Sequence, residues 1–187
     1  MRTVDIPVIE LSGTPRERGR VYGETVRSLI VRVVETWREN LANFNINNAS
    51  TKPIDSNSYL DQFLSQTNYL TAIEKWTPDL LEEVKGIAEG SGQTFENILA
   101  LQFMDEEWIF GLRNRQDRPN TKCTAFGVPN QVNGISYAGQ NMDIPSWVEG
   151  TQVLLRVMPT DTSPEALVFA FAGIIGLNGL NASALGV

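Results

Sequence analysis

Few side chains in this sequence are suited to covalent chemistry, because the chain has one cysteine and no histidine. Without histidine, the chain itself holds no Ser-His-Asp triad, no Cys-His dyad and no histidine-ligated zinc site. The acidic spacing of an oxygen-ligated calcium loop is also absent from the sequence. Cys123 is therefore the candidate nucleophile, and an enzyme built on it needs an unusual general base.

Two short runs of β-type residues surround this cysteine. An Asn-Gly turn signal lies between them, and the pattern predicts that Cys123–Val128 pairs antiparallel with Gly134–Asn141. Asp143 follows the second run, twenty residues after Cys123. The hairpin would bring both residues to one end of the sheet. Two plainer interpretations stay open, namely a small buried thiol at Cys123 and an aspartate that only starts a turn at Asp143.

Three consecutive carboxylates, Asp105, Glu106 and Glu107, also suggest acid/base chemistry. Three neighbours in sequence cannot share one face of a helix. At least part of this group is therefore expected to be a solvated patch.

Four segments in the same order resemble one enzyme family. C-T-x-F followed by G-x-N-x-D (123–143) is similar to the core motif of the N-terminal-nucleophile hydrolases. RERGRVYGE (16–24) and LLEEVKGIAEGSGQTFENILALQ (80–102) resemble two segments of the penicillin acyltransferase-like family, whose type activity is acyl-coenzyme A:6-aminopenicillanate acyltransferase. GIIGLNGLNASALGV (173–187) resembles the strand entry G-x-N-x-x-G-L of that family. Choloylglycine hydrolases and acid-ceramidase-like amidases share the core motif more distantly.

The resemblance implies a mechanism without histidine. The precursor is cut between Lys122 and Cys123, and the new α-amino group becomes the base for its own thiol. An α-amine has a pKa of ~7.7–8.0 and a thiol ~8.5, so the two exchange a proton near neutral pH. By resemblance, Asp143 holds the amine while Asn141 and Thr124 support it, and an acyl group passes through a thioester to water or to an amine. The family commonly has glycine where this chain has Lys122, so we expect slower or incomplete self-cleavage, or cleavage by another protease.

The period of the apolar residues changes near residue 120, which indicates an α+β chain. Residues 1–122 are expected to be a mainly helical pro-segment, and residues 123–187 the start of the β-rich catalytic part. The resemblance implies a four-layer αββα sandwich, of which the chain would hold only the first part. The strand pattern continues to the last residue, and the oxyanion-hole asparagine of the relatives would lie beyond it. We therefore expect the 187-residue form to be nearly inactive, since such donors are worth ~2.7–4 kcal/mol each.

Helix signals are clearest at the N-terminal end. A capping box that starts at Thr14 predicts a helix from Pro15 to Glu39. Gly19 and Gly23 lie four residues apart in it, which favours the close approach of another helix. Two further helices are expected, one that begins near Tyr59 and one that begins at Thr77-Pro78, and a fourth is expected over residues 94–112.

Composition restricts the partners. The net charge of −7 argues against nucleic acid, no apolar run reaches the ~18 residues of a membrane span, and no secretory signal is evident. We expect a cytoplasmic protein with no metal or cofactor that acts on a small-molecule amide or acyl substrate. Two alternatives stay open: a non-catalytic pro-segment or scaffold that associates through a free sheet edge, and a redox-sensing thiol with Arg118 and Lys122 nearby.

Overall fold

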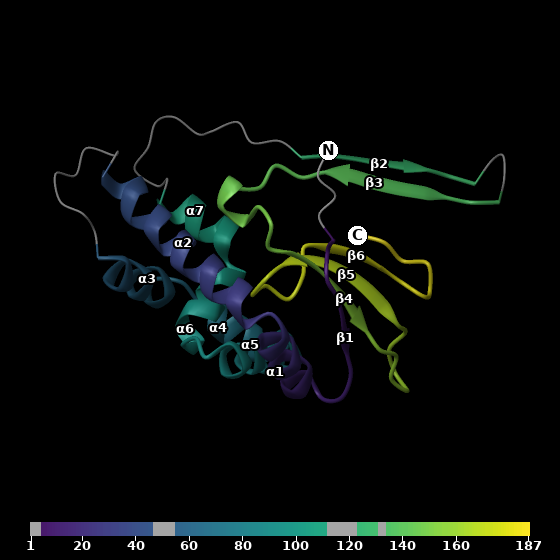
Figure 1. The fold of residues 1–187 in the computed structure, drawn as a ribbon, viewed down its shortest axis with the longest axis horizontal. Coiled ribbons are helices and arrows are strands. Elements are labelled where there is room, and N and C mark those ends of the chain that lie inside the picture. The colour runs from purple at the N-terminus through teal and green to yellow at the C-terminus, as the bar shows by residue number, and fades with distance from the viewer. Residues whose placement is uncertain (1–4, 47–54, 112–122, 131–133) are drawn as a thin grey trace.

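The computed structural model describes residues 5–46, 55–111, 123–130 and 134–187 (Figure 1). The elements in chain order are β1 (Val8–Leu11), α1 (Pro15–Thr25), α2 (Arg27–Ile46), α3 (Ser56–Ser65), α4 (Tyr69–Trp76), α5 (Pro78–Ser91), α6 (Phe95–Gln102), α7 (Met104–Gly111), β2 (Thr124–Val128), β3 (Tyr137–Asn141), the 3₁₀ turn η1 (Ser146–Val148), β4 (Gln152–Val157), β5 (Ala166–Phe171) and β6 (Asn178–Asn181). Helices before residue 111 and strands after residue 123 confirm the predicted α+β class.

The larger sheet has the strand order β1-β4-β5-β6. Its three C-terminal strands pair antiparallel, but β1 pairs parallel to β4, with Val8 opposite Leu154 and Leu11 opposite Val157. The short run VIEL was not recognised as a strand from the sequence. The N-terminal segment therefore supplies one strand to the sheet as well as the helices.

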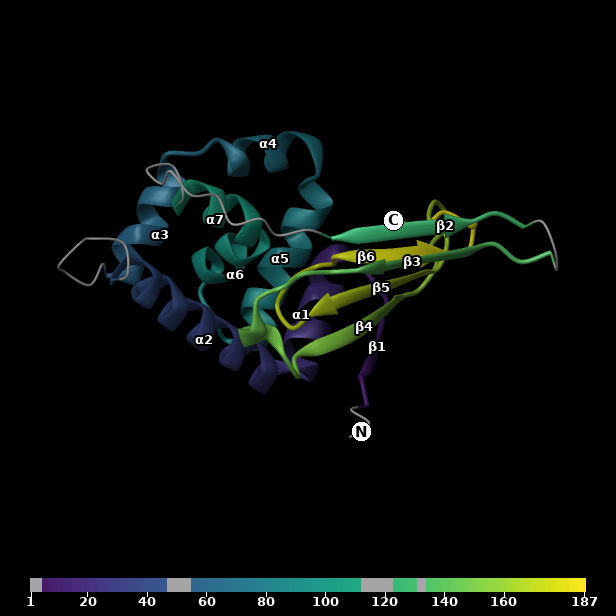
Figure 2. The same cartoon turned by 90° about the horizontal axis from the view of Figure 1, so that it is seen from above.

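The molecule is layered around this sheet. In Figure 1, α1 and α5 lie to the lower left of the four-stranded sheet and the β2–β3 hairpin lies above it. Figure 2 shows the hairpin running over β5 and β6. On the helical side, Val153, Leu155 and Ala170 are fully buried and share a core with Ile30 and Trp37 of α2. The hydrophobic core thus lies between the sheet and the helices.

Four glycines bring α1 and α5 into backbone contact. A Cβ atom on Gly19 would lie 2.0 Å from the carbonyl oxygen of Glu83, and one on Gly86 would lie 2.2 Å from that of Arg16. A Cβ atom on Gly23 would lie 2.6 Å from the carbonyl oxygen of Ile87, and one on Gly90 would lie 2.2 Å from that of Arg20. The close approach predicted at Gly19 and Gly23 is confirmed, and only glycine fits such a crossing.

The predicted helix from Pro15 to Glu39 is divided in two. Its capping box is present, since the Thr14 amide donates to Glu17 Oε2 at 2.8 Å and Thr14 Oγ1 accepts from the Glu17 amide at 3.4 Å. The backbone of Val26 (φ −118°, ψ 30°) leaves the helical conformation and separates α1 from α2. The break gives the two helices separate directions, so that α1 packs its glycines on α5 while α2 keeps Trp37 in the core. The helix expected over residues 94–112 is likewise divided, at Phe103.

Tyr22 joins α1 to the end of β5. Its hydroxyl donates to the Phe171 carbonyl oxygen at 3.1 Å and accepts from the Gly173 amide at 3.0 Å. The ring is fully buried, and this burial raises the pKa of the Tyr22 hydroxyl. The hydroxyl therefore satisfies two buried backbone groups of a distant segment.

Tyr22→Phe is expected to lower the free energy of unfolding by about 1–3 kcal/mol, because it leaves a buried N–H and a buried C=O without this partner. Urea unfolding of both proteins measures the difference. Tyr69→Phe is the matched control, because Tyr69 is half-buried and contributes a ring stacked on Phe103 at 4.9 Å between centroids. Equal losses in the two variants would argue against the hydrogen-bonding role of Tyr22.

Candidate active site

The β2–β3 hairpin positions the residues selected from the sequence. Thr124 pairs with Asn141 at one end of the ladder, and Val128 pairs with Tyr137 at the other. The predicted antiparallel pairing is therefore confirmed over these residues. Cys123 directly precedes β2, so it stands at the same end of the hairpin as the Thr124–Asn141 pair.

Asp143 also belongs to this end of the hairpin. It follows the last residue of β3 by two positions, and the chain then turns into η1. The hairpin thus brings Cys123, Thr124, Asn141 and Asp143 to one end of a two-stranded ladder. Lys122, the residue before the expected cleavage point, lies outside the described residues.

Local chemistry explains why this segment forms a hairpin. Gly134 has a φ of +81°, which suits the glycine of an Asn-Gly turn. Gly139 stands opposite Phe126, and a Cβ atom at this position would lie 2.6 Å from the Phe126 ring. The Phe126 ring thus covers the glycine of the G-x-N-x-D motif and leaves no room for a larger residue at this position.

The candidate residues are accessible to solvent. Cys123 is an exposed free thiol and not a core residue, and Thr124, Asn141 and Asp143 are exposed as well. Such a thiol can be reached by a substrate or by a labelling reagent without opening the core.

The three consecutive carboxylates have different environments. Asp105 and Glu106 are exposed, as expected for a solvated patch, whereas Glu107 is buried. The Tyr59 hydroxyl donates to Glu107 Oε1 at 2.5 Å. Burial raises the pKa of Glu107 to about 7, although hydrogen bonds from Tyr59 and Trp37 favour the charged form.

The burial of Glu107 and its contact with Tyr59 were not predicted from the sequence. The available signal was the spacing in the expected helix over residues 94–112, where Glu107 follows Phe103 by four residues and would share its face of that helix. The Glu107–Tyr59 contact connects α7 to α3 and lies inside the helical part of the protein. It is a separate buried site and is made by none of the hairpin residues.

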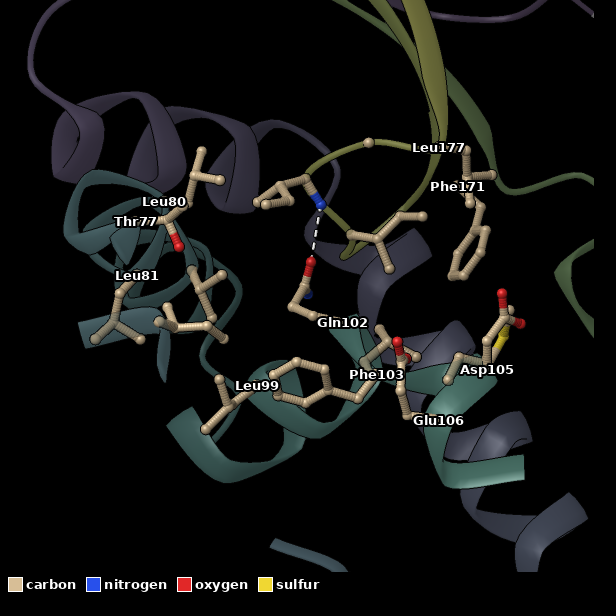
Figure 3. A pocket seen from close by; sticks show the side chains of 17 residues that line it. Thr77, Leu80, Leu81, Leu99, Gln102, Phe103, Asp105, Glu106, Phe171 and Leu177 are labelled. Atoms are coloured by element: carbon tan, nitrogen blue, oxygen red, sulfur yellow. Dashed lines mark hydrogen bonds between the residues drawn. The ribbon is translucent and has the colours of Figure 1, made fainter. Parts of the chain in front are cut away.

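A pocket of about 390 Å³ lies between the helices and the β5–β6 connection (Figure 3). The side chain of Gln102 forms part of the pocket wall. Its Nε2 donates to the Gly173 carbonyl oxygen at 2.8 Å, and its Oε1 accepts from the Ile175 amide at 3.0 Å. Neither Cys123 nor Asp143 lines this pocket. The hairpin residues and the pocket are therefore two distinct features.

The described residues form neither a metal-binding cluster nor a membrane-spanning helix. Over the described ranges, no group of three or more Cys, Asp and Glu side chains is placed to hold a metal ion. No helix in the part of the chain that the structure covers is long and apolar enough to cross a membrane. A search against protein-family models found none that matches the chain.

Proposed function

We propose that this chain belongs to an amide hydrolase or acyltransferase that uses the N-terminal cysteine of a processed chain as its nucleophile. The observation that carries the proposal is the hairpin register, because it brings an exposed Cys123 and the acidic Asp143 to one end of the ladder. The helix–sheet–hairpin layering supports a fold of the αββα class, in which the hairpin would begin the second sheet. The resemblance of the four sequence segments points to the penicillin acyltransferase-like branch.

Processing would generate the catalytic base. The Cys123 thiolate attacks the carbonyl carbon of Lys122, the peptide nitrogen takes a proton, and the resulting thioester is hydrolysed by water. The products are a carboxylate on Lys122 and a free α-amine on Cys123. An amide nitrogen has no basic lone pair, so the amine exists only after this step.

The free amine then serves the substrate reaction. It removes the thiol proton, and the thiolate attacks the carbonyl carbon of a small-molecule amide. The leaving amine takes that proton, and the acyl group remains on sulfur as a thioester until water or a second amine accepts it. Asp143 would orient the amine through a hydrogen bond, with Asn141 and Thr124 as supporting residues. A free thiol also suits a reducing compartment such as the cytoplasm.

Intact mass spectrometry tests the proposal. Because self-cleavage of this chain is expected to be slow, we expect prolonged incubation to convert a minor fraction of wild-type protein into a fragment that ends at Lys122 and another that begins at Cys123. The second fragment should form acyl adducts with N-acyl amides. Cys123→Ala should remain uncut and form no adduct. Ser136→Ala is the matched control, because Ser136 is an exposed residue at the opposite end of the same hairpin, and this variant should be cut at the wild-type rate.

Three outcomes separate the steps. Cleavage of Cys123→Ala at the wild-type rate would assign processing to another protease and leave Cys123 as the nucleophile to be tested by its adducts. Amidase activity in an uncut wild type would contradict the mechanism, because the blocked nitrogen cannot act as a base. Intact wild type that forms no adduct with any N-acyl amide would contradict the function.

A second candidate is a binding scaffold, favoured by the apolar face of the hairpin. Phe126, Val128 and Tyr137 lie on one face of it and are 58%, 50% and 51% exposed. Exposed aromatic and β-branched side chains on a two-stranded ladder are suited to association with another sheet or chain. Sedimentation of wild type and a Phe126→Ser variant tests it: a scaffold of this kind predicts self-association that the variant weakens.

A further inference from the structure

The pocket has an apolar interior. It lies between α4 and α5 on one side and α6, α7 and the β5–β6 connection on the other. Figure 3 shows the side chains that line it, most of them aliphatic or aromatic. They include Leu81, Val84, Leu99, Phe103 and Leu177. Its volume of about 390 Å³ falls within the range of small-molecule sites.

The side-chain amide of Gln102, in the pocket wall, already has hydrogen-bond partners. The Gln102 amide donates to the carbonyl oxygens of Ile98 and Gly173, both at 2.8 Å, and accepts from the Ile175 amide at 3.0 Å. This amide therefore fixes the β5–β6 connection to α6. The interior of the pocket is therefore suited to bind a hydrocarbon group, and a polar group of a ligand would interact at the rim.

The rim of the pocket is acidic. Asp105 and Glu106 line it and are exposed to solvent, as is Leu80 across the pocket. Among the described residues that line the pocket, none is lysine or arginine. An apolar cavity with two carboxylates at its mouth complements a molecule with a hydrocarbon tail and a cationic head.

We propose that this pocket binds an amphiphilic amine, with a single hydrocarbon tail against the leucines and the ammonium group beside Asp105 and Glu106. A primary amine has a pKa near ~10.4 and is charged at neutral pH. The inference does not rest on the proposed function, because the pocket is formed by other residues than those of the hairpin end.

A purely structural role of the two carboxylates makes a different prediction. Asp105 and Glu106 lie in the first turn of α7, where negative charge stabilises a helix. In that case they would affect folding but would not distinguish a cationic ligand from a neutral one. The informative measurement is therefore the difference in binding affinity between an amine and an alcohol of the same chain length.

Calorimetric titration of the 187-residue chain at pH 7 with hexylamine, octylamine, octanol and octanoate tests the proposal. We expect saturable binding of octylamine, weaker binding of octanol and the weakest binding of octanoate. Between hexylamine and octylamine, affinity should rise about fourfold for each methylene, the equivalent of ~0.8 kcal/mol. No saturable binding of octylamine, or equal affinity for octylamine and octanol, would overturn the proposal.

Two variants locate the site. Asp105→Asn combined with Glu106→Gln should weaken octylamine about fivefold and leave octanol unchanged, whereas Glu96→Gln, an exposed first-turn carboxylate of α6 outside the pocket, should change neither. Leu80→Trp places a larger side chain on an exposed rim position and should weaken both ligands at least tenfold. A double variant that affects the amine and the alcohol equally, or a Leu80→Trp variant that binds both normally, would contradict the assignment.

Discussion

Gly19→Ala is expected to lower the free energy of unfolding by about 3 kcal/mol, although alanine is the better helix former by about 1 kcal/mol. The reason is that the new methyl group would lie 2.0 Å from the Glu83 carbonyl oxygen, so α1 and α5 must move apart. Backbone atoms of two helices cannot yield as a flexible side chain can. Gly86→Ala should act similarly, since its methyl group would lie 2.2 Å from the Arg16 carbonyl oxygen.

Gly127→Ala is the matched control for these two variants. No atom lies within 4 Å of a Cβ built on Gly127, and its φ is not in the left-handed region. Urea unfolding at pH 7 should give this variant a stability within about 0.5 kcal/mol of wild type. If Gly19→Ala instead stabilised the protein, helix propensity would outweigh the crossing and the contact between α1 and α5 would be looser than described.

Glu107→Gln is expected to stabilise the protein by about 3 kcal/mol at pH 8 and to have little effect at pH 4. Burial raises the pKa of Glu107 from its ordinary value of 4.5 to about 7. At a pH between 4.5 and about 7, Glu107 keeps its proton in the folded chain but has lost it in the unfolded chain. The contribution of Glu107 to the free energy of unfolding therefore falls as the pH rises through this interval. The interval corresponds to about 3 kcal/mol at ~1.36 kcal/mol per pH unit. A glutamine carries no charge and retains an oxygen that accepts the Tyr59 hydroxyl.

The measurement is urea unfolding of both proteins from pH 4 to pH 8, compared as a difference at each pH. Subtracting the variant removes the contribution of surface carboxylates with lowered pKa, such as Glu82 and Glu89, which titrate at the acidic end in both proteins. Glu106→Gln is the control, since the neighbouring carboxylate is exposed. A difference that stays constant with pH would show that Glu107 ionises in the folded protein as it does in the unfolded chain.

Features that depend on nearby residues could be predicted from the sequence. The capping box is set by residues three apart, and the hairpin by a turn and two alternating runs. The glycine spacing at Gly19 and Gly23 predicted a close helix neighbour and was confirmed, although it did not identify α5. In each case the local sequence favours one conformation, and the tertiary contacts stabilise that same conformation.

Features that depend on distant contacts could not be predicted in the same way. β1 has four residues, and its partner β4 lies more than a hundred residues away, so no local period distinguishes it from an extended loop. The break at Val26 follows from the separate packing of α1 and α2, and the burial of Glu107 follows from the position of α3. The sequence also did not show whether Cys123 is a buried thiol or an accessible nucleophile, because that depends on whether distant parts of the chain cover it.

A break in the backbone between residues 111 and 123 would produce two polypeptides that remain non-covalently associated. The first would retain β1 and Tyr22, and the second would retain β4 and the end of β5. The β1–β4 ladder, the Glu10–Arg156 ion pair at 2.7 Å and both hydrogen bonds of the Tyr22 hydroxyl would join them. The two pieces would then behave as subunits of an obligate heterodimer. Their stability would depend on protein concentration, which that of the uncut chain does not.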